Sequence, residues 1–425
     1  MTCQVARLKV RRLIVMDISV VVTLVLVLTI WLLPFYSREF RNSTQLMLAY
    51  WFVLIPHQAV AFTNAFLFTT LRADQDARSF HKYGVMIAQS ENFIFPIGDI
   101  FYRNMLGVIY WIFDPSLILG QQFSILAFSI SCIVLIQLLS QLELSRYKVP
   151  ILLVFGALPT MVFINPLTLR EPYEIMFFLL AVYFGLKMHM TGGINRYLLF
   201  MIISVACMAA FHQALCFYAL FLVALFLLWS PRPVSRLLNI KKLRLIVFLV
   251  VPALIIAIPY FTAVTSPISR FLTGDIKELL DSISTYRNAS FITRASYGLS
   301  FDSSSSFMVI YSTFKLYLYY LFAPFPWKVS NALDVYASME SLLRLVLICF
   351  ALKNWRNAYG TQRRLLGLML ILYFSMTFLW ALGTTNYGQA IRHNMLSWWI
   401  LVITGLPLLM ETLKRSFPGL LIRRQ

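Results

Sequence analysis

The sequence predicts an all-α protein, a polytopic bundle of about 11 to 13 transmembrane helices that forms one integral membrane domain over residues 1–425. Composition is the first reason: 60% of the residues are hydrophobic and 12% are charged, whereas a soluble domain carries about 25% charged residues. Mean hydropathy is +0.76 over the whole chain, and the apolar runs leave no room for a soluble domain of ordinary size. The basic residues bunch in short links beside these runs, which is the positive-inside pattern.

The distribution of charge argues against a nucleic-acid-binding protein, and the positions of the cysteines argue against a metal site or a secreted disulfide framework. The net charge of +19 would suggest nucleic acid in a soluble protein, but nucleic-acid binding needs a basic aqueous surface with exposed aromatic rings. We therefore expect no nucleic-acid partner. The five cysteines mostly fall inside apolar runs without the spacing of a metal site or a secreted disulfide framework, so we interpret them as small buried side chains.

The first half of the chain contains several runs of the ~20 residues that a spanning helix needs. The first, Leu13–Tyr36, is too long for a cleaved signal peptide and is interpreted as a retained helix. A short amphipathic piece is expected at Asn104–Phe113. Further spans are expected at Leu46–Thr70, Leu117–Ser140, Val149–Asn165 and Tyr173–Met188.

In the second half, the apolar run Tyr197–Trp229 is too long for one span. His212-Gln213 at its centre predicts a break between two short helices. A long polar region follows the next span, and residues 265–330 are expected to form an outer loop. The remaining apolar segments are Leu245–Phe261, Phe307–Phe322, Leu333–Phe350, Leu365–Leu382 and Met395–Met410.

The basic links give a consistent topology. Residues 232–244, 353–364 and the C-terminal end are strongly basic and are expected in the cytoplasm. Counting spans from them places links 145–148 and 187–196 inside. The outer side then holds the loop 71–105, residues 165–172, the His212 break, the loop 265–330 and residues 384–394.

The N-terminus conflicts with this scheme. Two complete spans before residue 71 would leave the basic residues Arg7–Arg12 outside. Either Leu46–Thr70 does not cross fully, or the N-terminus breaks the charge rule. Sidedness of the N-terminus is therefore open.

The outer loop 71–105 holds the densest group of ionisable residues. Few such groups fall mid-span, where an ion-coupled transporter would place them, so the pattern favours a site at the outer membrane surface. The alternative is a solvated loop that only connects two helices. The candidate residues are Asp74 and Asp76 for catalysis and His81 and Tyr83 for substrate binding, and the loop also holds Asp99 and Arg103.

Three further outer positions are candidates for substrate binding. Arg170-Glu171 opens a helix and either binds a phosphate or forms a local ion pair, with Glu171 and Glu174 favoured by the helix dipole. His212 is either functional or a hydrogen-bonded core histidine. Arg392-His393 lies where a polar loop re-enters an apolar helix, which suits a phosphodiester clamp or a snorkelling arginine.

Four stretches together resemble the GT-C superfamily of membrane glycosyltransferases, and more narrowly the polytopic bacterial proteins encoded with surface-polysaccharide genes. They cover about a quarter of the chain, and their order and spacing carry the resemblance. They are ADQDARSFHKYGVMIA, PTMVFINPLTLREPYEIMFFLLAVYFGLK, YYLFAPFPWKVSNALDVYASMESLLRLVL and TNYGQAIRHNMLSWWILV.

The resemblance implies a substrate and a mechanism. Such enzymes take a sugar or oligosaccharide from a polyprenyl phosphate or diphosphate at the outer face of the cytoplasmic (inner) membrane, usually with inversion. Asp74 or Asp76 would be the general base on the acceptor hydroxyl. Arg170, Arg392 and His393 would hold the departing phosphate. No cofactor is expected, and a need for a divalent metal is left open. The chain departs from the usual pattern in having two candidate acids and an extra N-terminal span.

Two alternatives stay open. A repeat-unit polymerase of the O-antigen or capsule type would use the same location and lipid carrier, and the outer arginines Arg270, Arg287 and Arg294 favour it slightly. A lipid-linked glycan flippase or transporter would need a polar pathway through the bilayer. The sequence does not identify the sugar, the acceptor, the linkage or the oligomeric state.

Overall fold

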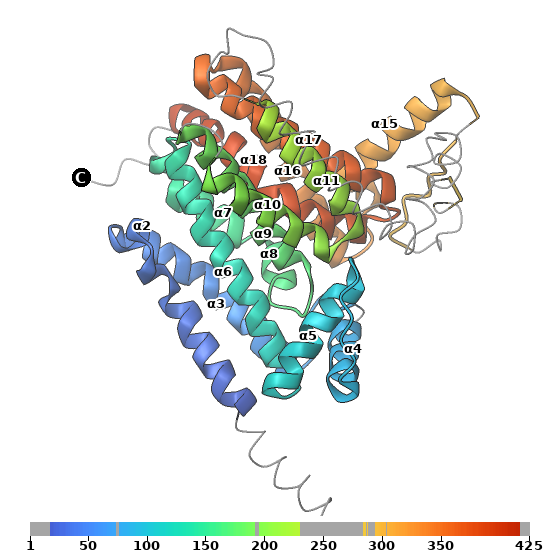
Figure 1. Cartoon of the computed structure of the whole chain (residues 1–425). Helices are drawn as coiled ribbons and strands as arrows, with labels where there is room; N and C mark the ends of the chain where they lie inside the picture. Colours follow the sequence, from blue (N-terminus) through green and yellow to red (C-terminus); the bar gives the residue numbers. More distant parts are fainter. Residues whose placement is uncertain are drawn as a thin grey trace, which may run out of the picture. The chain divides into compact units, whose positions relative to one another are not determined.

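The computed structural model describes residues 18–73, 76–191, 195–229, 284–285, 287, 294–302 and 304–416. These residues form helices joined by short links (Figure 1), and their single β feature is an isolated bridge between Ser296 and Asn386. The all-α prediction is therefore confirmed for the part of the chain that the structure describes. The expected span Leu245–Phe261 lies outside that part.

Seven helices of the described residues are long and apolar enough to cross a membrane, which supports a multi-pass membrane protein. Two shorter apolar helices, α10 (Arg196–Phe211) and α11 (Gln213–Leu228), accompany them. The seven are Ile18–Tyr36, α3 (Thr44–Phe66), α6 (Leu117–Gln141), α9 (Glu171–Met190), α16 (Ala332–Asn357), α17 (Gly360–Gly383) and α18 (Tyr387–Ser416).

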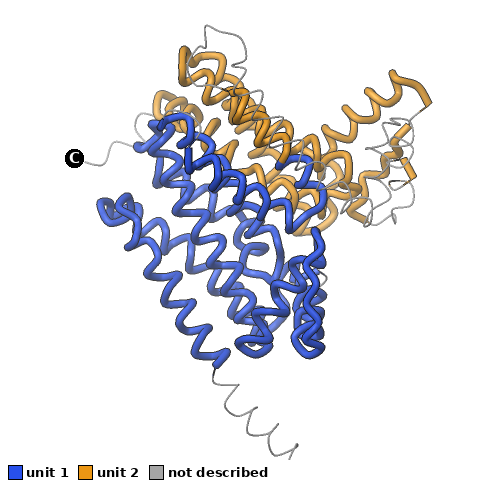
Figure 2. Tube along the Cα trace, viewed as in Figure 1, with its two compact units in different colours: residues 1–219 blue, residues 220–425 orange. Residues whose placement is uncertain are grey.

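The chain divides into two compact units, residues 1–219 and 220–425 (Figure 2). The first unit also holds η1 (Leu33–Tyr36), α2 (Arg38–Arg41), α4 (Asp76–Ser90), α5 (Asp99–Phe113), η2 (Ser145–Tyr147), α7 (Lys148–Gly156) and α8 (Pro159–Ile164). The second adds α15 (Ser306–Phe322) and η3 (Pro326–Lys328). Whether these units act as the one membrane domain expected from the sequence stays a prediction.

The break expected inside the long apolar run is confirmed. Helix α10 ends at Phe211 and α11 begins at Gln213, with His212 between them in an extended backbone conformation. Gly98 donates its backbone N–H to the carbonyl of Ala210 at 2.9 Å. The break therefore lies directly against the outer loop 71–105, as the topology requires.

The expected span Val149–Asn165 is wrong, because two short helices, α7 and α8, occupy it. The chain turns at Leu158, whose ψ of 131° is extended. Pro159 explains the turn, since a proline ring excludes the helical conformation for the residue before it and cannot donate a hydrogen bond to the preceding turn.

The last helix also begins earlier than expected. Helix α18 starts at Tyr387, whereas the sequence placed residues 384–394 in a polar loop and the span at Met395. Residues 295–297 fix this start, because Tyr387 donates its N–H to the carbonyl of Ala295, and Tyr297 donates to the carbonyl of Thr385. Both segments were expected outside, and the structure joins them.

An ion pair joins two links at one end of the first unit. Lys148, in a link expected inside, lies 2.5 Å from Glu39, which precedes α3. Both ends of this contact therefore share one side of the membrane. Helix α3 has the length and composition to cross from there to the outer loop, which favours a complete crossing over a partial one.

Candidate functional site

The outer loop 71–105 is a helical hairpin of α4 and α5 in the first unit, with the two helices side by side in Figure 1. Asp76 is the first residue of α4 and is exposed. Asp74 lies outside the described residues. A carboxylate at an exposed helix start is accessible to a substrate, and it also suits the positive end of the helix dipole.

His81 lies one turn further along α4 and is held by α5. Its Nδ1 atom is 2.9 Å from the hydroxyl of Tyr110, within hydrogen-bond distance. Burial lowers the pKa of His81 below its ordinary value of 6.5. A neutral imidazole with one nitrogen in this contact can accept or donate a proton through its other nitrogen.

Arg103 and Tyr83 form a second contact within the hairpin. The Arg103 guanidinium lies 4.3 Å from the centre of the Tyr83 ring and 2.6 Å from the Asp99 carboxylate. Both contacts join residues of the same hairpin, so they stabilise it. Tyr83 was expected to bind substrate, and the structure places it beneath this cation with 41% of its surface exposed.

Buried tyrosines fix the hairpin to α9. Tyr102, Tyr110 and Tyr173 are each at most 7% exposed, and the rings of Tyr102 and Tyr173 lie 5.7 Å apart. Burial raises the pKa of Tyr102 and of Tyr110, so both hydroxyls stay protonated. Thr168 adds a hydrogen bond of 2.8 Å to the carbonyl of Ala77 in α4.

Arg170 is committed to contacts within the first unit. Its Nε atom lies 3.5 Å from Glu174 and its Nη1 atom donates to the carbonyl of Phe211 at 3.3 Å. Glu171 is 2% exposed in the first turn of α9. Arg170 was interpreted either as a phosphate-binding residue or as part of a local ion pair, and these contacts agree with the ion pair. The partner is Glu174 instead of Glu171.

His212 sits at the break between α10 and α11. Its Nδ1 atom accepts the backbone N–H of Ala214 at 3.2 Å. Gln213 reaches the carbonyl of Ile97 at 3.5 Å. The outer positions His81, Arg170 and His212 therefore belong to one contiguous group of elements in the first unit: the hairpin, the start of α9 and the α10–α11 break.

Arg392 and His393 lie in the second unit, in the early turns of α18 and not in a loop. His393 stacks on Trp380 with ring centres 4.0 Å apart, and its Nδ1 atom is 2.9 Å from the Thr384 hydroxyl. Arg392 is partly buried. These contacts hold the start of α18 against the end of α17.

Arg287 has a structural position that the sequence did not indicate. It is 5% exposed, and its Nη1 atom donates to the carbonyls of Ala381, Leu382 and Thr384 at 3.1 to 3.4 Å. A helix leaves its last carbonyls without partners, and a cation is favourable there. Arg287 therefore caps the end of α17.

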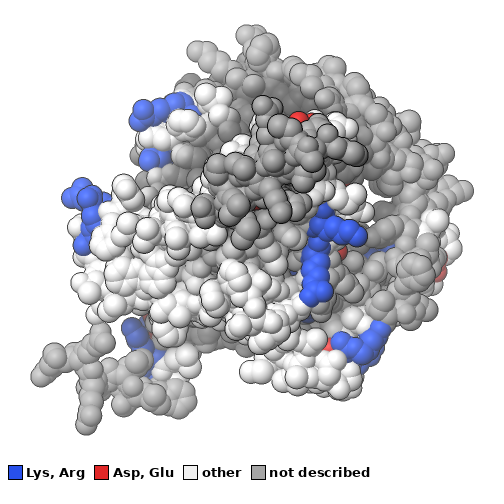
Figure 3. Space-filling view, turned by 90° about the horizontal axis from the view of Figure 1, so that it is seen from below, with Lys and Arg blue, Asp and Glu red and all other residues white. Residues whose placement is uncertain are grey.

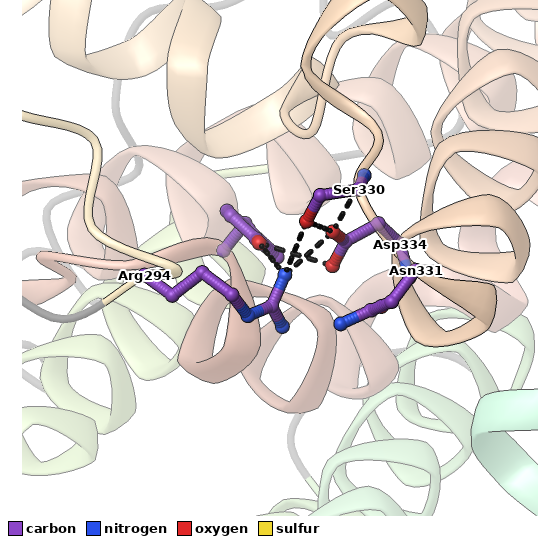
Figure 4. A network of polar contacts seen from close by, with 5 residues as sticks. Arg294, Ser330, Asn331 and Asp334 are labelled. Carbon is purple, nitrogen blue, oxygen red and sulfur yellow. Dashed lines mark hydrogen bonds and ion pairs between the residues drawn. The ribbon is translucent and has the colours of Figure 1, made fainter.

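Arg294 is the centre of a polar network (Figure 4). Its Nη1 atom donates to Asp334 at 2.5 Å, to Ser330 at 3.1 Å and to Tyr387 at 3.0 Å. Tyr387 in turn donates to the other oxygen of Asp334 at 3.0 Å. The side chain of Asp334 is 1% exposed, whereas that of Arg294 is 50% exposed, so one side of the guanidinium stays accessible.

The sequence carried a signal for this network that was missed. Asn331 accepts the backbone N–H of Asp334 at 3.0 Å and caps the start of α16. An Asn followed three residues later by an acidic residue is typical of a helix start. The Asp334 side chain turns back to Ser330 at 2.8 Å, which orients it toward Arg294.

The network borders a pocket of about 270 Å³ in the second unit. Arg294 and Lys328 supply two cations to its lining. The Lys328 ammonium lies 5.6 Å from the centre of the Tyr319 ring, and Tyr319 packs edge-on against Phe325 at 5.1 Å. The pocket thus combines positive charge, hydroxyl groups and aromatic faces.

One face of the described residues is sparsely charged. In Figure 3, Lys and Arg side chains interrupt a mostly uncharged surface, and few acidic atoms are visible. Among the described residues, no group of three or more His, Cys, Asp or Glu side chains is placed to hold a metal ion.

No protein family model matches this chain, and no curated protein or solved structure is similar to it. The membrane class therefore rests on the helices, and the function on the sites described above.

Proposed function

We propose that this protein is a membrane glycosyltransferase that takes a sugar or oligosaccharide from a polyprenyl phosphate or diphosphate at the outer face of the cytoplasmic membrane. The observation that carries the proposal is the second-unit pocket, in which Arg294 and Lys328 accompany aromatic rings.

Arg294 suits the phosphate. Asp334 and Tyr387 hold one edge of its guanidinium, so the side chain is already ordered before a ligand binds. Half of the side chain is exposed. Arginine offers several N–H donors in a planar fork that matches phosphate oxygens, and Lys328 adds a second positive charge on the same pocket. Both charges would stabilise a departing phosphate.

The aromatic side chains suit the sugar and the first part of the lipid. Tyr319, Phe325 and Tyr387 line the pocket, and Trp327 stacks on Phe325 with ring centres 5.0 Å apart while 77% of its surface is exposed. Pockets for small ligands commonly combine apolar walls with a few placed polar groups. An exposed tryptophan beside a membrane-length helix is typical of the membrane interface.

The reaction class follows from the resemblance. A carboxylate takes the proton of the acceptor hydroxyl, the hydroxyl oxygen attacks the anomeric carbon, and the bond to the phosphate oxygen breaks. The resemblance implies Asp74 or Asp76 as this base. Asp76 is exposed at the start of α4 in the first unit, whereas the phosphate pocket belongs to the second unit. His81 is a nearby residue that can pass a proton.

The structure weakens one argument for a repeat-unit polymerase, namely the availability of Arg287 to bind a glycan diphosphate. It depended on outer arginines gripping a glycan diphosphate, but Arg287 is buried and donates to three backbone carbonyls. Arg270 lies outside the described residues. Arg294 serves both reactions equally well, so we place the transfer of a lipid-linked sugar first.

The test is a binding measurement on the full-length protein in detergent, with farnesyl phosphate as the probe. A hydrogen bond to a charged group contributes about 1.5–3 kcal/mol, so Lys328→Ala and Arg294→Gln should each weaken binding about 10- to 100-fold. Arg356→Gln, an exposed arginine of α16, should bind like the unchanged protein.

Farnesol serves as the second control, since it lacks the phosphate. Its affinity should be the same for all variants. Unchanged farnesyl phosphate affinity in both Lys328→Ala and Arg294→Gln would remove the pocket as the phosphate site.

A further inference from the structure

The link between α9 and α10 carries two cations that the proposed reaction does not use. Lys187 is in the last turn of α9, and Arg196 is the first residue of α10. Arg196 is exposed and Lys187 is partly exposed. The topology expected from the charge rule places both cations at the inner surface of the membrane.

Two tyrosines hold these cations together. The Lys187 Nζ atom lies 3.1 Å from the Tyr183 hydroxyl and 4.9 Å from the centre of the Tyr197 ring. Arg196 donates to the Tyr197 hydroxyl at 3.4 Å, and its guanidinium carbon lies 5.3 Å from the centre of the same ring. Both charges act on the Tyr197 hydroxyl, so the two cations converge on one end of this side chain.

No carboxylate of the described residues pairs with these cations. Residues 175–274 contain no Asp or Glu, and neither Lys187 nor Arg196 forms an ion pair within the part of the chain that the structure describes. An ammonium has three N–H donors and a guanidinium has five, whereas the tyrosine hydroxyls take one from each cation. Donors therefore remain on both cations for an external anion.

An exposed apolar stripe follows Arg196 along α10. Leu199, Phe200 and Ile203 are 58%, 42% and 48% exposed, and they come three, four and seven residues after Arg196. This spacing places all four side chains on one face of the helix. A cation at the end of an exposed apolar stripe matches a phospholipid, in which a charged headgroup precedes an acyl chain.

We propose that Lys187 and Arg196 bind the headgroup phosphate of one anionic phospholipid of the inner leaflet, and that its acyl chain lies along Leu199 and Ile203. Two positive charges without a carboxylate favour a lipid with a net negative headgroup over a zwitterionic lipid. The helix dipole acts in the same direction, since the first turn of α10 disfavours a cation and favours an anion. This site belongs to the first unit, whereas the pocket described above belongs to the second.

Native mass spectrometry of the full-length protein in detergent tests the site, with phosphatidylglycerol and phosphatidylcholine of the same acyl chains as probes. Each Lys or Arg near a membrane surface changes the affinity for an anionic lipid about fivefold. Arg196→Gln should therefore weaken binding of the first phosphatidylglycerol about fivefold, and the double variant Lys187→Gln, Arg196→Gln about 25-fold. Phosphatidylcholine, whose headgroup has no net charge, should bind about equally to every variant.

Arg146→Gln is the matched control, because Arg146 is also exposed, lies in a link expected inside and stacks on a tyrosine at 4.6 Å. It should bind phosphatidylglycerol like the unchanged protein. Circular dichroism and gel filtration verify that each variant is folded, and Arg196→Gln changes only an exposed side chain. Equal phosphatidylglycerol affinity of the double variant and the unchanged protein, or no preference of the unchanged protein between the two lipids, would overturn the proposal. Complete displacement of the lipid by glycerol phosphate would also overturn it, because the cations would then bind a soluble phosphate.

Discussion

Arg294 illustrates how one residue can serve both structure and binding. Its ion pair with Asp334 is half open to solvent on the arginine side, and exposed pairs contribute little to stability. The carboxylate, however, is fully buried, so it needs the donors of Ser330 and Tyr387 as well. The network therefore orients a cation whose free side remains available to an anion.

His81 provides a pH test at the same scale. Its folded-state pKa lies below 6.5 because of burial, so the unfolded chain binds a proton first as the pH falls. The stability contribution of the neutral form is present above about pH 6.5 and is lost as the pH falls further. His81→Gln, whose amide can still reach Tyr110, should lose less stability between about pH 7.5 and 5.5 than the unchanged protein.

Thermal unfolding of both proteins in detergent, followed by tryptophan fluorescence, measures this difference. The other histidines are the same in both proteins, so their contributions cancel in the comparison. An equal decrease in Tm for the two proteins would show that His81 is not buried as described.

At the scale of elements, close helix packing depends on small residues. Gly405 of α18 faces the backbone of α16, and a Cβ atom at this position would lie 2.5 Å from the carbonyl oxygen of Leu347. Helices in membranes approach closely where a glycine removes the side chain. The obstacle is backbone, so it cannot move aside without shifting a helix.

Gly405→Ala should therefore destabilise the second unit by about 1–3 kcal/mol, the usual cost of overpacking a core. The drop in Tm should be clear in detergent. Gly383→Ala is the matched control, because no atom lies within 4 Å of an added Cβ there. If both changes had the same effect, α16 and α18 would not be in this contact.

Particular elements show which parts of the fold could be predicted from the sequence. The bounds of α6 followed from the length of an apolar run, and the break at His212 followed from run length together with the polar pair His212-Gln213 at its centre. The α7–α8 turn was missed because a proline near the middle of an apolar run marks either a kink or an end. The early start of α18 depends on hydrogen bonds to residues 295 and 297, about ninety positions earlier, and the Arg294–Asp334 pair likewise joins distant segments. No local pattern reports such contacts.

At the scale of the whole molecule, the contacts of the first unit group the loops as the predicted topology does. The outer positions, residues 71–105, the start of α9 and the His212 break, contact one another. The links expected inside, at Glu39 and Lys148, also meet. The contacts within residues 37–213 therefore agree with the grouping of loops that the charge rule predicts.

Cysteine labelling in intact cells tests this topology. Lys82→Cys on α4 should react with a membrane-impermeant maleimide, because the side chain is exposed on the outer hairpin. Arg146→Cys, exposed at the other end, should react only after permeabilisation. The unchanged protein gives the background from its own cysteines. Protection of Lys82→Cys in intact cells would reverse the topology.

The most direct test of glycosyl transfer is the release of polyprenyl phosphate from a polyprenyl-phosphate-linked sugar by the purified full-length protein with an acceptor glycan. We predict release by the unchanged protein and a loss of at least about a hundredfold in Asp74→Asn or Asp76→Asn, with farnesyl phosphate binding retained. Release that is absent with every lipid-linked sugar tested, or undiminished in both variants, would contradict the account.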